Sequence, residues 1–287
     1  MSGDVLSCIH KKMSALSKGQ KRIAAYILDS YDKAAFLTAG ALGKAAQVSE
    51  STVVRFAAEL GYSGYPEMQK ALQEMVLNRL TTAQRMEISG KRLSEHDILT
   101  SVFQSDAERI RTTGEEMDRN AFSRAVEAIL GAKTIYILGV RSSSALASFL
   151  GFYFRYMFDD VRVITTAASS EMFESIVRIS PQDVAIGISF PRYSTATCKA
   201  LQFCRHSGAA TVALTDSPTA PPAQYADCLL TAKSDMVSLV DSLVAPMSLI
   251  NALIAAVAAR REAETTDVFS KLEGIWDRYH VYEKGDE

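Results

Sequence analysis

Cysteine is scarce in this sequence, with four residues among 287. Cys8, Cys198, Cys204 and Cys228 are widely spaced, with no C-x-x-C pair and no neighbouring histidine cluster. This spacing excludes the usual ligand pattern of a zinc site and is typical of reduced thiols rather than of a disulfide framework. The first segment, 1–20, also lacks an apolar core of signal-peptide length. We therefore expect no metal and a cytoplasmic location.

Long uncharged runs are also rare. One stretch, 242–259, carries no charge and is about as long as a bilayer crossing, which needs about 18–20 apolar residues. It contains Pro246 and Asn251 and is rich in alanine. These features favour a helix buried in a core or in a subunit interface, and we expect no membrane partner.

Neither sign of charge dominates the whole chain, but the two ends differ. The formal net charge is −2, and the composition is that of an ordinary globular protein, with 48% hydrophobic and 22% charged residues. Residues 1–80 hold ten Lys or Arg and seven Asp or Glu, whereas the remainder holds 21 and 26. A basic first part on an acidic second part fits a protein whose first part touches DNA, and the length suits two domains.

The segment 38–69 carries the strongest local pattern of the first part. A short helix ending near Ala46 is followed by a turn at Gln47, and Ser49 would cap the next helix by accepting hydrogen bonds from its exposed amides. Gly61 would end that second helix. The apolar residues that helical periodicity places on its core face are Val53, Phe56, Ala57 and Leu60. The pattern predicts a helix-turn-helix within an all-α domain.

The opposite face of this second helix carries small polar side chains and one arginine. Arginine can hold a guanine through two hydrogen bonds, and hydroxyls reach bases or phosphates, so the face suits the DNA major groove. The candidate DNA-binding residues are Lys44, Ser49, Ser51, Thr52, Arg55 and Lys70, with the two lysines as phosphate contacts. The alternative is an ordinary helical hairpin whose polar face meets water.

From about residue 120, apolar β-rich runs occur at 134–140, 161–166, 183–189, 210–215 and 227–232. Helical patterns separate the first four runs. This alternation predicts an α/β domain with a five-stranded parallel sheet, helices on both faces and the flavodoxin-like order 2-1-3-4-5. A last long helix is expected at about 236–263.

Two loops that follow the first and third strands are rich in hydroxyls and each carries an arginine. They are "ILGVRSSSALAS" (137–148) and "ISFPRYSTAT" (188–197). In the predicted order these strands are neighbours, and ligands of such sheets bind at the carboxyl ends of the strands. Hydroxyls, helix amides and guanidinium groups suit a phosphate. The candidate ligand-binding residues are Gly139, Arg141, Ser142, Ser143, Ser189, Arg192, Tyr193, Ser194 and Thr195, with Glu171 from the helix after the second strand.

Neither loop has the G-x-G-x-x-G pattern of a dinucleotide site or the Lys-Ser/Thr pair of a P-loop, so we expect no NAD, no ATP and no other cofactor. The alternative is that the serines only cap helices.

With "VSESTVVRFAAELGYSGYPEMQ" and the two loops in this order, the chain resembles the RpiR family of bacterial transcriptional regulators over nearly its full length. The resemblance implies a regulator of sugar-metabolism genes, a phosphosugar effector bound in a sugar isomerase (SIS) domain, and a homodimer or homotetramer. Ser143 matches the serine of the family's G-x-G-x-S loop, and Ser189 and Ser194 match the outer hydroxyls of S-x-S-G-x-T. Arg141 stands where glycine is usual, and Pro191-Arg192 replaces Ser-Gly.

The rival function is an active phosphosugar isomerase with an accessory helical domain. That chemistry needs a base beside the phosphate pocket. Glu171 is the one carboxylate considered, and it also suits a helix N-terminus; His206 falls at the end of a helix, beyond the expected crevice. The interpretation we favour is a sensor and not an enzyme.

The domains expected are a DNA-binding domain (1–77), a linker and connecting helix (78–118), the phosphosugar-binding domain (119–265) and a helical tail (266–287).

Overall fold

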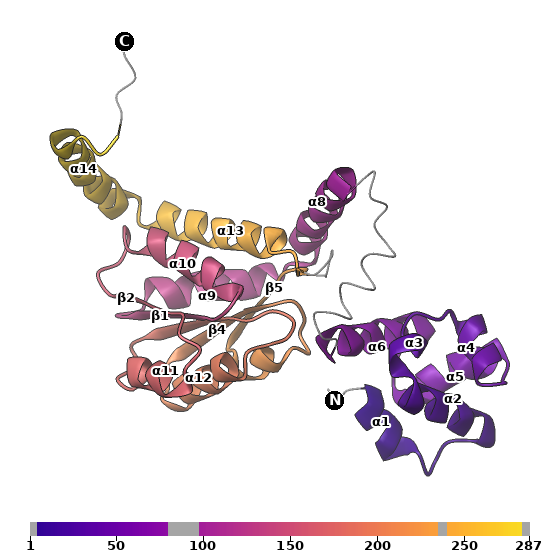
Figure 1. Cartoon of the computed structure of the whole chain (residues 1–287). Coiled ribbons are helices and arrows are strands. Elements are labelled where there is room, and N and C mark those ends of the chain that lie inside the picture. The colour runs from indigo at the N-terminus through magenta and orange to yellow at the C-terminus, as the bar shows by residue number, and fades with distance from the viewer. Residues whose placement is uncertain (1–4, 80–97, 235–239, 283–287) are drawn as a thin grey trace. The chain divides into compact units, whose positions relative to one another are not determined.

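The computed structural model describes residues 5–79, 98–234 and 240–282, and the chain forms two compact units (Figure 1). We call Met1–Ile88 the head and Ser89–Glu287 the body. The described part of the head is helical, and the body combines a parallel sheet with helices. The predicted fold class, an all-α domain followed by an α/β domain, is confirmed.

The head packs short helices around one apolar core. Its described helices are α1 (Val5–Lys12), α2 (Lys18–Asp29), α3 (Tyr31–Ala34), α4 (Ala39–Ala45), α5 (Glu50–Leu60) and α6 (Tyr65–Arg79). Ile23, Phe56 and Met68 are fully buried in this core. Local signals set the helix starts, because Ser17 forms a capping box with Gln20 at α2.

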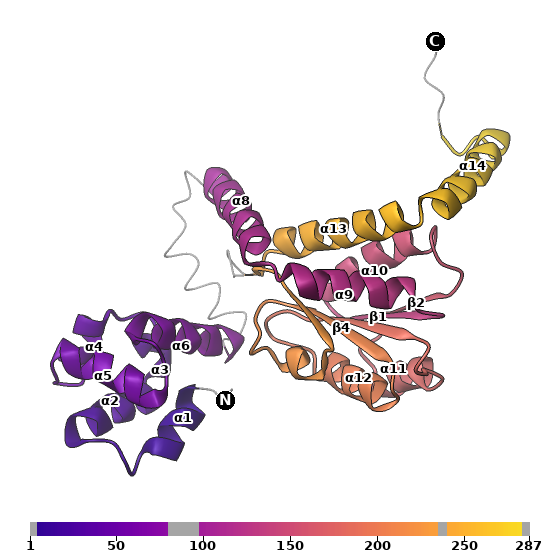
Figure 2. The same cartoon turned by 180° about the vertical axis from the view of Figure 1, so that it is seen from behind.

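The body is built on five parallel strands in the order β2-β1-β3-β4-β5, as predicted (Figure 2). The strands are β1 (Ile135–Gly139), β2 (Val161–Ile164), β3 (Val184–Ile188), β4 (Ala210–Thr215) and β5 (Cys228–Thr231). Each lies within its predicted run. In the register of β1 and β3, Gly139 lies opposite Ile188, so the two hydroxyl-rich loops leave neighbouring strand ends.

Helices cover both faces of the sheet (Figures 1 and 2). One face packs against α9 (Arg119–Leu130), α10 (Ser143–Phe154) and α13 (Val244–Arg260), and the other against α11 (Ser169–Ile176) and α12 (Thr195–His206). Strand residues alternate between the two cores: Ile135 and Ile137 belong to the first, whereas Tyr136 and Leu138 belong to the second.

The prediction of one long last helix at 236–263 is wrong in its extent. Residues 235–239 lie outside the described residues, α13 begins only at Val244, and it ends at Arg260. The chain then bends by 98° into α14 (Glu262–Tyr279). At the bend, Arg261 has a non-helical backbone with φ −119° and ψ 32°. Its guanidinium stacks 4.7 Å from the centre of the Phe158 ring and bonds to Glu264.

The connecting segment is helical where it is described. α8 (Ile98–Glu116) lies within the range expected for the linker and connecting helix, 78–118, while residues 80–97 lie outside the described residues. The boundary expected at residue 265 falls inside α14.

Among the described residues, no single helix is long and apolar enough to cross a membrane. α13 and α14 meet the criteria of length and composition only when taken together.

Candidate functional sites

The turn between α4 and α5 has the geometry of a helix-turn-helix. Gln47 adopts a left-handed backbone with φ 55°, the conformation that favours glycine. A Cβ on Gly43 would lie 2.9 Å from the Val48 carbonyl oxygen, so the absence of a side chain there lets the turn pack onto α4. At the far end of α5, Gly61 with φ 102° ends the helix, as predicted.

The two faces of α5 separate as the periodicity predicted. Val53, Phe56, Ala57 and Leu60 are buried. On the other face, Ser49, Ser51 and Arg55 are exposed and Thr52 is half-buried, so this face is available to a partner.

The cap of α5 differs from the prediction. Ser49 precedes the helix, but its side chain accepts no bond from the helix amides. Its hydroxyl instead lies 3.0 Å from the Ser51 hydroxyl and 2.8 Å from that of Thr52. The prediction of a capping hydroxyl was wrong because neighbouring hydroxyls compete for the same side chain. The result is a cluster of three hydroxyls at the start of α5.

The remaining candidates of this interface are exposed. The Arg55 Nε donates to the Ser51 carbonyl at 3.2 Å, so the guanidinium follows the outer face of α5. Lys44 lies in the last turn of α4, whereas Lys70 lies on α6, outside the two helices of the turn.

The first loop of the body is set by Gly139. A Cβ there would lie 2.7 Å from the Ser143 carbonyl oxygen and 2.9 Å from the Ala147 Cβ, so only glycine allows α10 to start this close to β1. Ser143 is 5% exposed in the first turn of α10, whereas Ser142 and Arg141 are exposed. Arg141 has φ 56°, the left-handed conformation that glycine would adopt without strain.

The second loop is closed by hydrogen bonds between its own serines. Ser189, 2% exposed, accepts a bond from the Ser194 amide at 3.0 Å. The Ser194 side chain caps α12 by accepting from the Thr197 amide at 3.1 Å, so the capping interpretation holds for this serine. Arg192 is exposed and again left-handed, with φ 63°. Thr195 is exposed in the first turn of α12.

These bonds leave the hydroxyl protons of both serines available to a ligand. Ser189 and Ser194 both use an oxygen lone pair to accept from a backbone amide, and among the described residues neither hydroxyl donates to a protein atom. A hydroxyl that accepts from the protein can still donate its proton. Both serines therefore suit a ligand made of acceptors, such as a phosphate.

Tyr193 of the second loop contacts a residue that the sequence gave no reason to select. Its hydroxyl donates to the Asp216 carboxylate, 2.8 Å from Oδ1 and 3.1 Å from Oδ2. Asp216 directly follows β4, so its proximity depends on the sheet order and not on local sequence. Thr197 was also missed: its hydroxyl is buried with no hydrogen-bond partner among the described residues, although it lies in the first turn of α12.

Asp216 also adjoins the connecting helix. It lines a hollow of about 10 Å³ together with Thr113 and Glu116 of α8 and with Lys233 after β5. Lys233 bonds to both α8 residues: its amide donates to the Thr113 hydroxyl at 3.0 Å and its ammonium lies 2.5 Å from Glu116. The second loop and α8 thus meet around one group of polar residues.

The two candidate bases of the rival function, Glu171 and His206, lie on α11 and α12. Glu171 is exposed and accepts a 2.6 Å bond from the Thr166 hydroxyl. His206 is the last residue of α12, at the opposite end from the second loop. The sequence-based placement of His206 beyond the crevice is consistent with this position.

Two family models match the chain. The helix-turn-helix domain of the rpiR family matches residues 3–79, and the SIS domain matches residues 128–256. The sugar isomerase domain of an RpiR transcription factor from Sphaerobacter thermophilus is 31% identical, with a TM-score of 0.59, over 62% of this chain and 98% of that chain. The chain belongs to the RpiR family of transcriptional regulators.

Two further proteins extend the similarity over most of the chain. An HTH-type transcriptional regulator of Haemophilus influenzae is 29% identical over 243 residues, which cover 80% of each chain. The fold of Vibrio vulnificus NanR, solved in complex with ManNAc-6P, matches 96% of this chain and 98% of that one, with a TM-score of 0.57 and 21% identity. The family that the motifs suggested is confirmed, and so is a helix-turn-helix regulator as the type of protein.

Proposed function

We propose that this RpiR-family protein binds DNA through α5 and regulates sugar-metabolism genes in response to a phosphorylated sugar held by the body. The proposal depends on one observation. A helix-turn-helix with a polar, exposed recognition face shares a chain with two serine-bearing loops at the neighbouring ends of β1 and β3. The NanR complex with ManNAc-6P supports a phosphosugar as the class of effector.

In this proposal the phosphate accepts hydrogen bonds from Ser143, Ser189 and Ser194. The last two are already oriented by bonds from backbone amides. Arg141 and Arg192 supply the positive charge, because a guanidinium binds a phosphate through two parallel hydrogen bonds. Ser142, Tyr193, Thr195 and Glu171 complete the proposed ligand set around the sugar.

We propose a sensor and not an isomerase. Proton transfer between sugar carbons requires a base within hydrogen-bond reach of the substrate. The Glu171 carboxylate accepts from Thr166 at the start of α11, and His206 ends α12. Neither arrangement favours a base directed at the serines.

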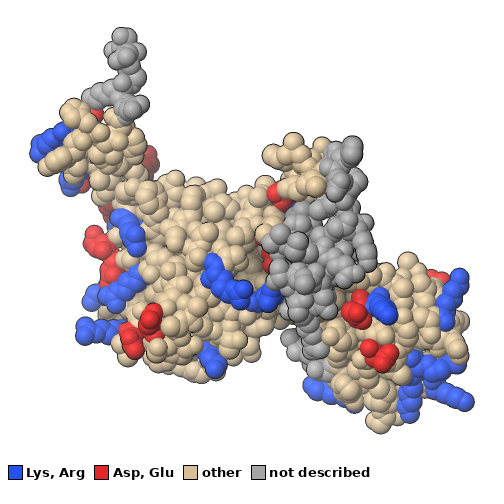
Figure 3. All heavy atoms as spheres, viewed as in Figure 1, with Lys and Arg blue, Asp and Glu red and all other residues tan. Residues whose placement is uncertain are grey.

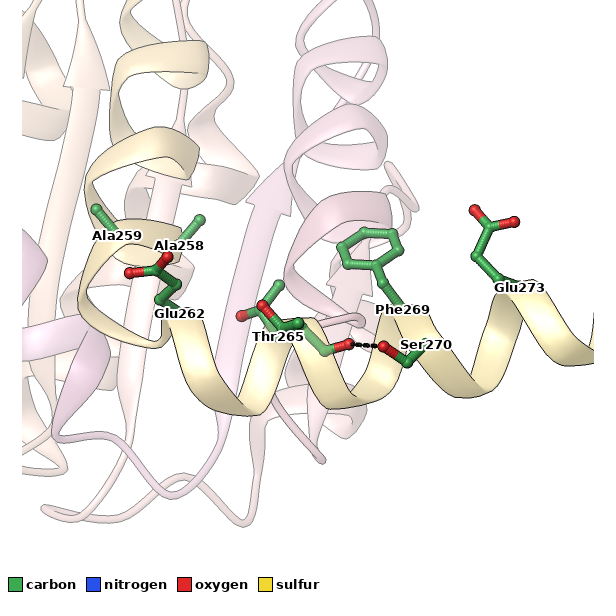
Figure 4. Close-up of a pocket in the computed structure, with 8 residues that line it drawn as sticks. Ala258, Ala259, Glu262, Thr265, Phe269, Ser270 and Glu273 are labelled. Atoms are coloured by element: carbon green, nitrogen blue, oxygen red, sulfur yellow. Dashed lines mark hydrogen bonds between the residues drawn. The ribbon is translucent and has the colours of Figure 1, made fainter.

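We propose that the working form is an oligomer of this chain, with α14 in the interface between copies. None of the residues of α14 is buried in its own chain. Among its large apolar side chains, Ile275 is 47% exposed and Tyr279 is 70% exposed. Most of the stability of a helix in a protein comes from packing its apolar face, so we expect α14 to pack on a partner. The bend before α14 also leaves a hollow of about 470 Å³, lined on one side by Ala258, Thr265 and Phe269 (Figure 4).

A row of aromatic rings continues this surface onto α10. Phe152 lies 5.2 Å from Tyr153 and 5.3 Å from Tyr156 between ring centres, and Tyr156 lies 5.0 Å from Phe269 of α14. Phe152 is 53% exposed. An exposed apolar surface that spans two helices is typical of a protein interface. A second copy of this chain is the occupant we propose.

The proposed mechanism links ligand, α8 and DNA. Effector binding stabilises one arrangement of the second loop, which Tyr193 and Asp216 connect to the polar group that Lys233 forms with Thr113 and Glu116 of α8. A ligand can shift such an equilibrium only through different affinities for the two arrangements. The resulting change in oligomer packing alters how two heads fit two DNA half-sites.

The test measures both binding and catalysis with one panel of sugars. Phosphosugars and their unphosphorylated counterparts are screened for a rise in melting temperature, since selective binding to the folded state stabilises it. The expected result is a rise with one or a few phosphosugars only, a changed affinity for DNA in their presence, and no isomerisation product. The double substitution Ser143→Ala and Ser194→Ala should abolish the response and spare DNA binding. No response to any phosphosugar would contradict the proposal, and isomerisation of a hit would favour the rival function.

A further inference from the structure

The exposed basic residues at the start of α2 form a surface that the helix-turn-helix alone does not explain. Lys18 and Lys21 are exposed, and Arg22 is exposed beside them. Residues three and four apart share a helix face, so these three side chains form one row, which we call the α2 basic row. Figure 3 shows Lys and Arg side chains gathered over the side of the head where α2 and α4 lie.

The α2 basic row lies beside the start of α5. A Cβ on Gly19 would lie 3.4 Å from the Thr52 Cγ2 and 3.5 Å from the Val48 Cγ1, so the first turn of α2 contacts the turn and the first turn of α5. The Arg22 guanidinium donates to the Gln47 carbonyl at 2.5 Å. This bond fixes the row against the left-handed turn residue that directs α5 outward.

No described acidic side chain neutralises the row. Among the described residues, none forms an ion pair with Lys18, Lys21 or Arg22. Glu50, at the start of α5, directs its carboxylate toward Gly40 of α4, where a Cβ would lie 3.2 Å from its Oε2. The α2 basic row therefore keeps its positive charge next to the hydroxyl cluster of Ser49, Ser51 and Thr52.

A short positive row beside a recognition face fits the DNA backbone. Exposed lysines neutralise phosphates whatever the base sequence, and such contacts fix the position of a protein on the duplex. If α5 lies in the major groove, a helix that touches its first turn lies over one of the flanking strands, where phosphates are the accessible groups.

We infer that Lys18 and Lys21 are a second DNA-contacting element, which binds backbone phosphates beside the groove entered by α5, and that Arg22 positions this element against the turn. The inference rests on the proposed DNA binding and adds the residues that anchor it.

The experiment measures binding as a function of salt. The duplex is selected by the full-length wild-type protein from a random-sequence DNA pool, and its dissociation constant is measured by fluorescence anisotropy at a series of salt concentrations. Each lost phosphate contact lowers the slope of log Kd against log salt by about 1. For Lys18→Gln with Lys21→Gln we expect a loss of about 2 in slope, weaker binding to all sequences, and unchanged base preference.

The matched control is Lys33→Gln, which removes the same charge from an exposed site on α3, beyond the other end of α2. It should leave the slope within the error of the wild type. A wild-type slope in the double variant, or an equal loss in Lys33→Gln, overturns the inference. In either case the proposed function stands if the wild type selects and binds a duplex; failure of the wild type to bind any duplex overturns both. The melting temperature of each variant confirms that it is folded.

Discussion

The Tyr193 hydroxyl donates to the Asp216 carboxylate, 2.8 Å from Oδ1. This bond joins the loop after β3 to the residue after β4. Asp216 in turn borders Thr113 near the end of α8 and Lys233 after β5. One tyrosine therefore connects the proposed effector loop to the helix that follows the linker.

Removing that hydroxyl should weaken both effector binding and its transmission. For Tyr193→Phe we expect the affinity for the effector found in the phosphosugar screen to fall about tenfold, since a hydrogen bond to a charged group contributes about 1.5–3 kcal/mol and the loop retains its serine bonds. DNA affinity without effector should be unchanged. Titration calorimetry and DNA anisotropy measure the two quantities, and Tyr225→Phe, a half-buried tyrosine before β5, serves as the control. An unchanged effector affinity would contradict the role of this bond.

The single arginine on the outer face of α5 should determine base choice. For Arg55→Ala we expect operator affinity to fall by about 1–3 kcal/mol, the contribution of a bidentate contact to guanine, together with relaxed preference at one base pair. Repeated selection from the random pool measures the preference. Arg178→Ala, an exposed arginine of the body, controls for loss of charge. If the variant keeps both its affinity and its base preference, α5 does not present this face to DNA.

Gln47 is strained where glycine would not be. A left-handed backbone costs a residue with a side chain about 1–2 kcal/mol, whereas glycine loses about 0.5–1 kcal/mol through its freer unfolded chain. We expect Gln47→Gly to raise the free energy of unfolding of the head by up to about 1 kcal/mol. Ala45→Gly, in the helical backbone of α4, should lower it by about 1 kcal/mol. Urea unfolding of both variants compares them, and a destabilised Gln47→Gly would show that its side chain stabilises the turn.

Sequence patterns predicted the strands and the core face of α5 because both depend on local periodicity. The left-handed backbone of Arg141 and Arg192 was not predicted, although the resemblance marks both as departures from glycine. Asp216 was missed because its contact with Tyr193 joins the ends of two strands, β3 and β4, and so depends on the order of the sheet. The bend at Arg261 was missed because the apolar run of α13 leads directly into α14 with no proline or glycine at the break.

The thiols of the body should be inert. Burial raises the pKa of the Cys198 thiol to about 11 and that of Cys204 to about 12, so at neutral pH almost none of either is the reactive thiolate. We expect iodoacetamide to modify Cys8, which is half-buried, well before these two in the native protein. Peptide mass spectrometry over time measures the order, with urea-unfolded protein as the control in which all sites react. Equally fast labelling of Cys204 and Cys8 in the native state would show that α12 opens readily.

The apolar face of α14 should hold two copies of the chain together. Ile275→Asp places a charge in the proposed interface, where burying an unpaired carboxylate is costly, so we expect dimerisation to weaken by about 2 kcal/mol or more. Val177→Asp introduces the same charge at an exposed apolar position of the body, 64% exposed at the end of α11, and should leave the assembly intact. Sedimentation velocity over a range of protein concentrations distinguishes the two. A wild type that sediments as a monomer, or an Ile275→Asp variant that assembles as the wild type does, would exclude α14 as the interface. Under the proposed mechanism two heads bind two half-sites, so loss of the dimer should also reduce operator affinity. The Ile275→Asp variant should then bind DNA more weakly although its recognition helix is unchanged.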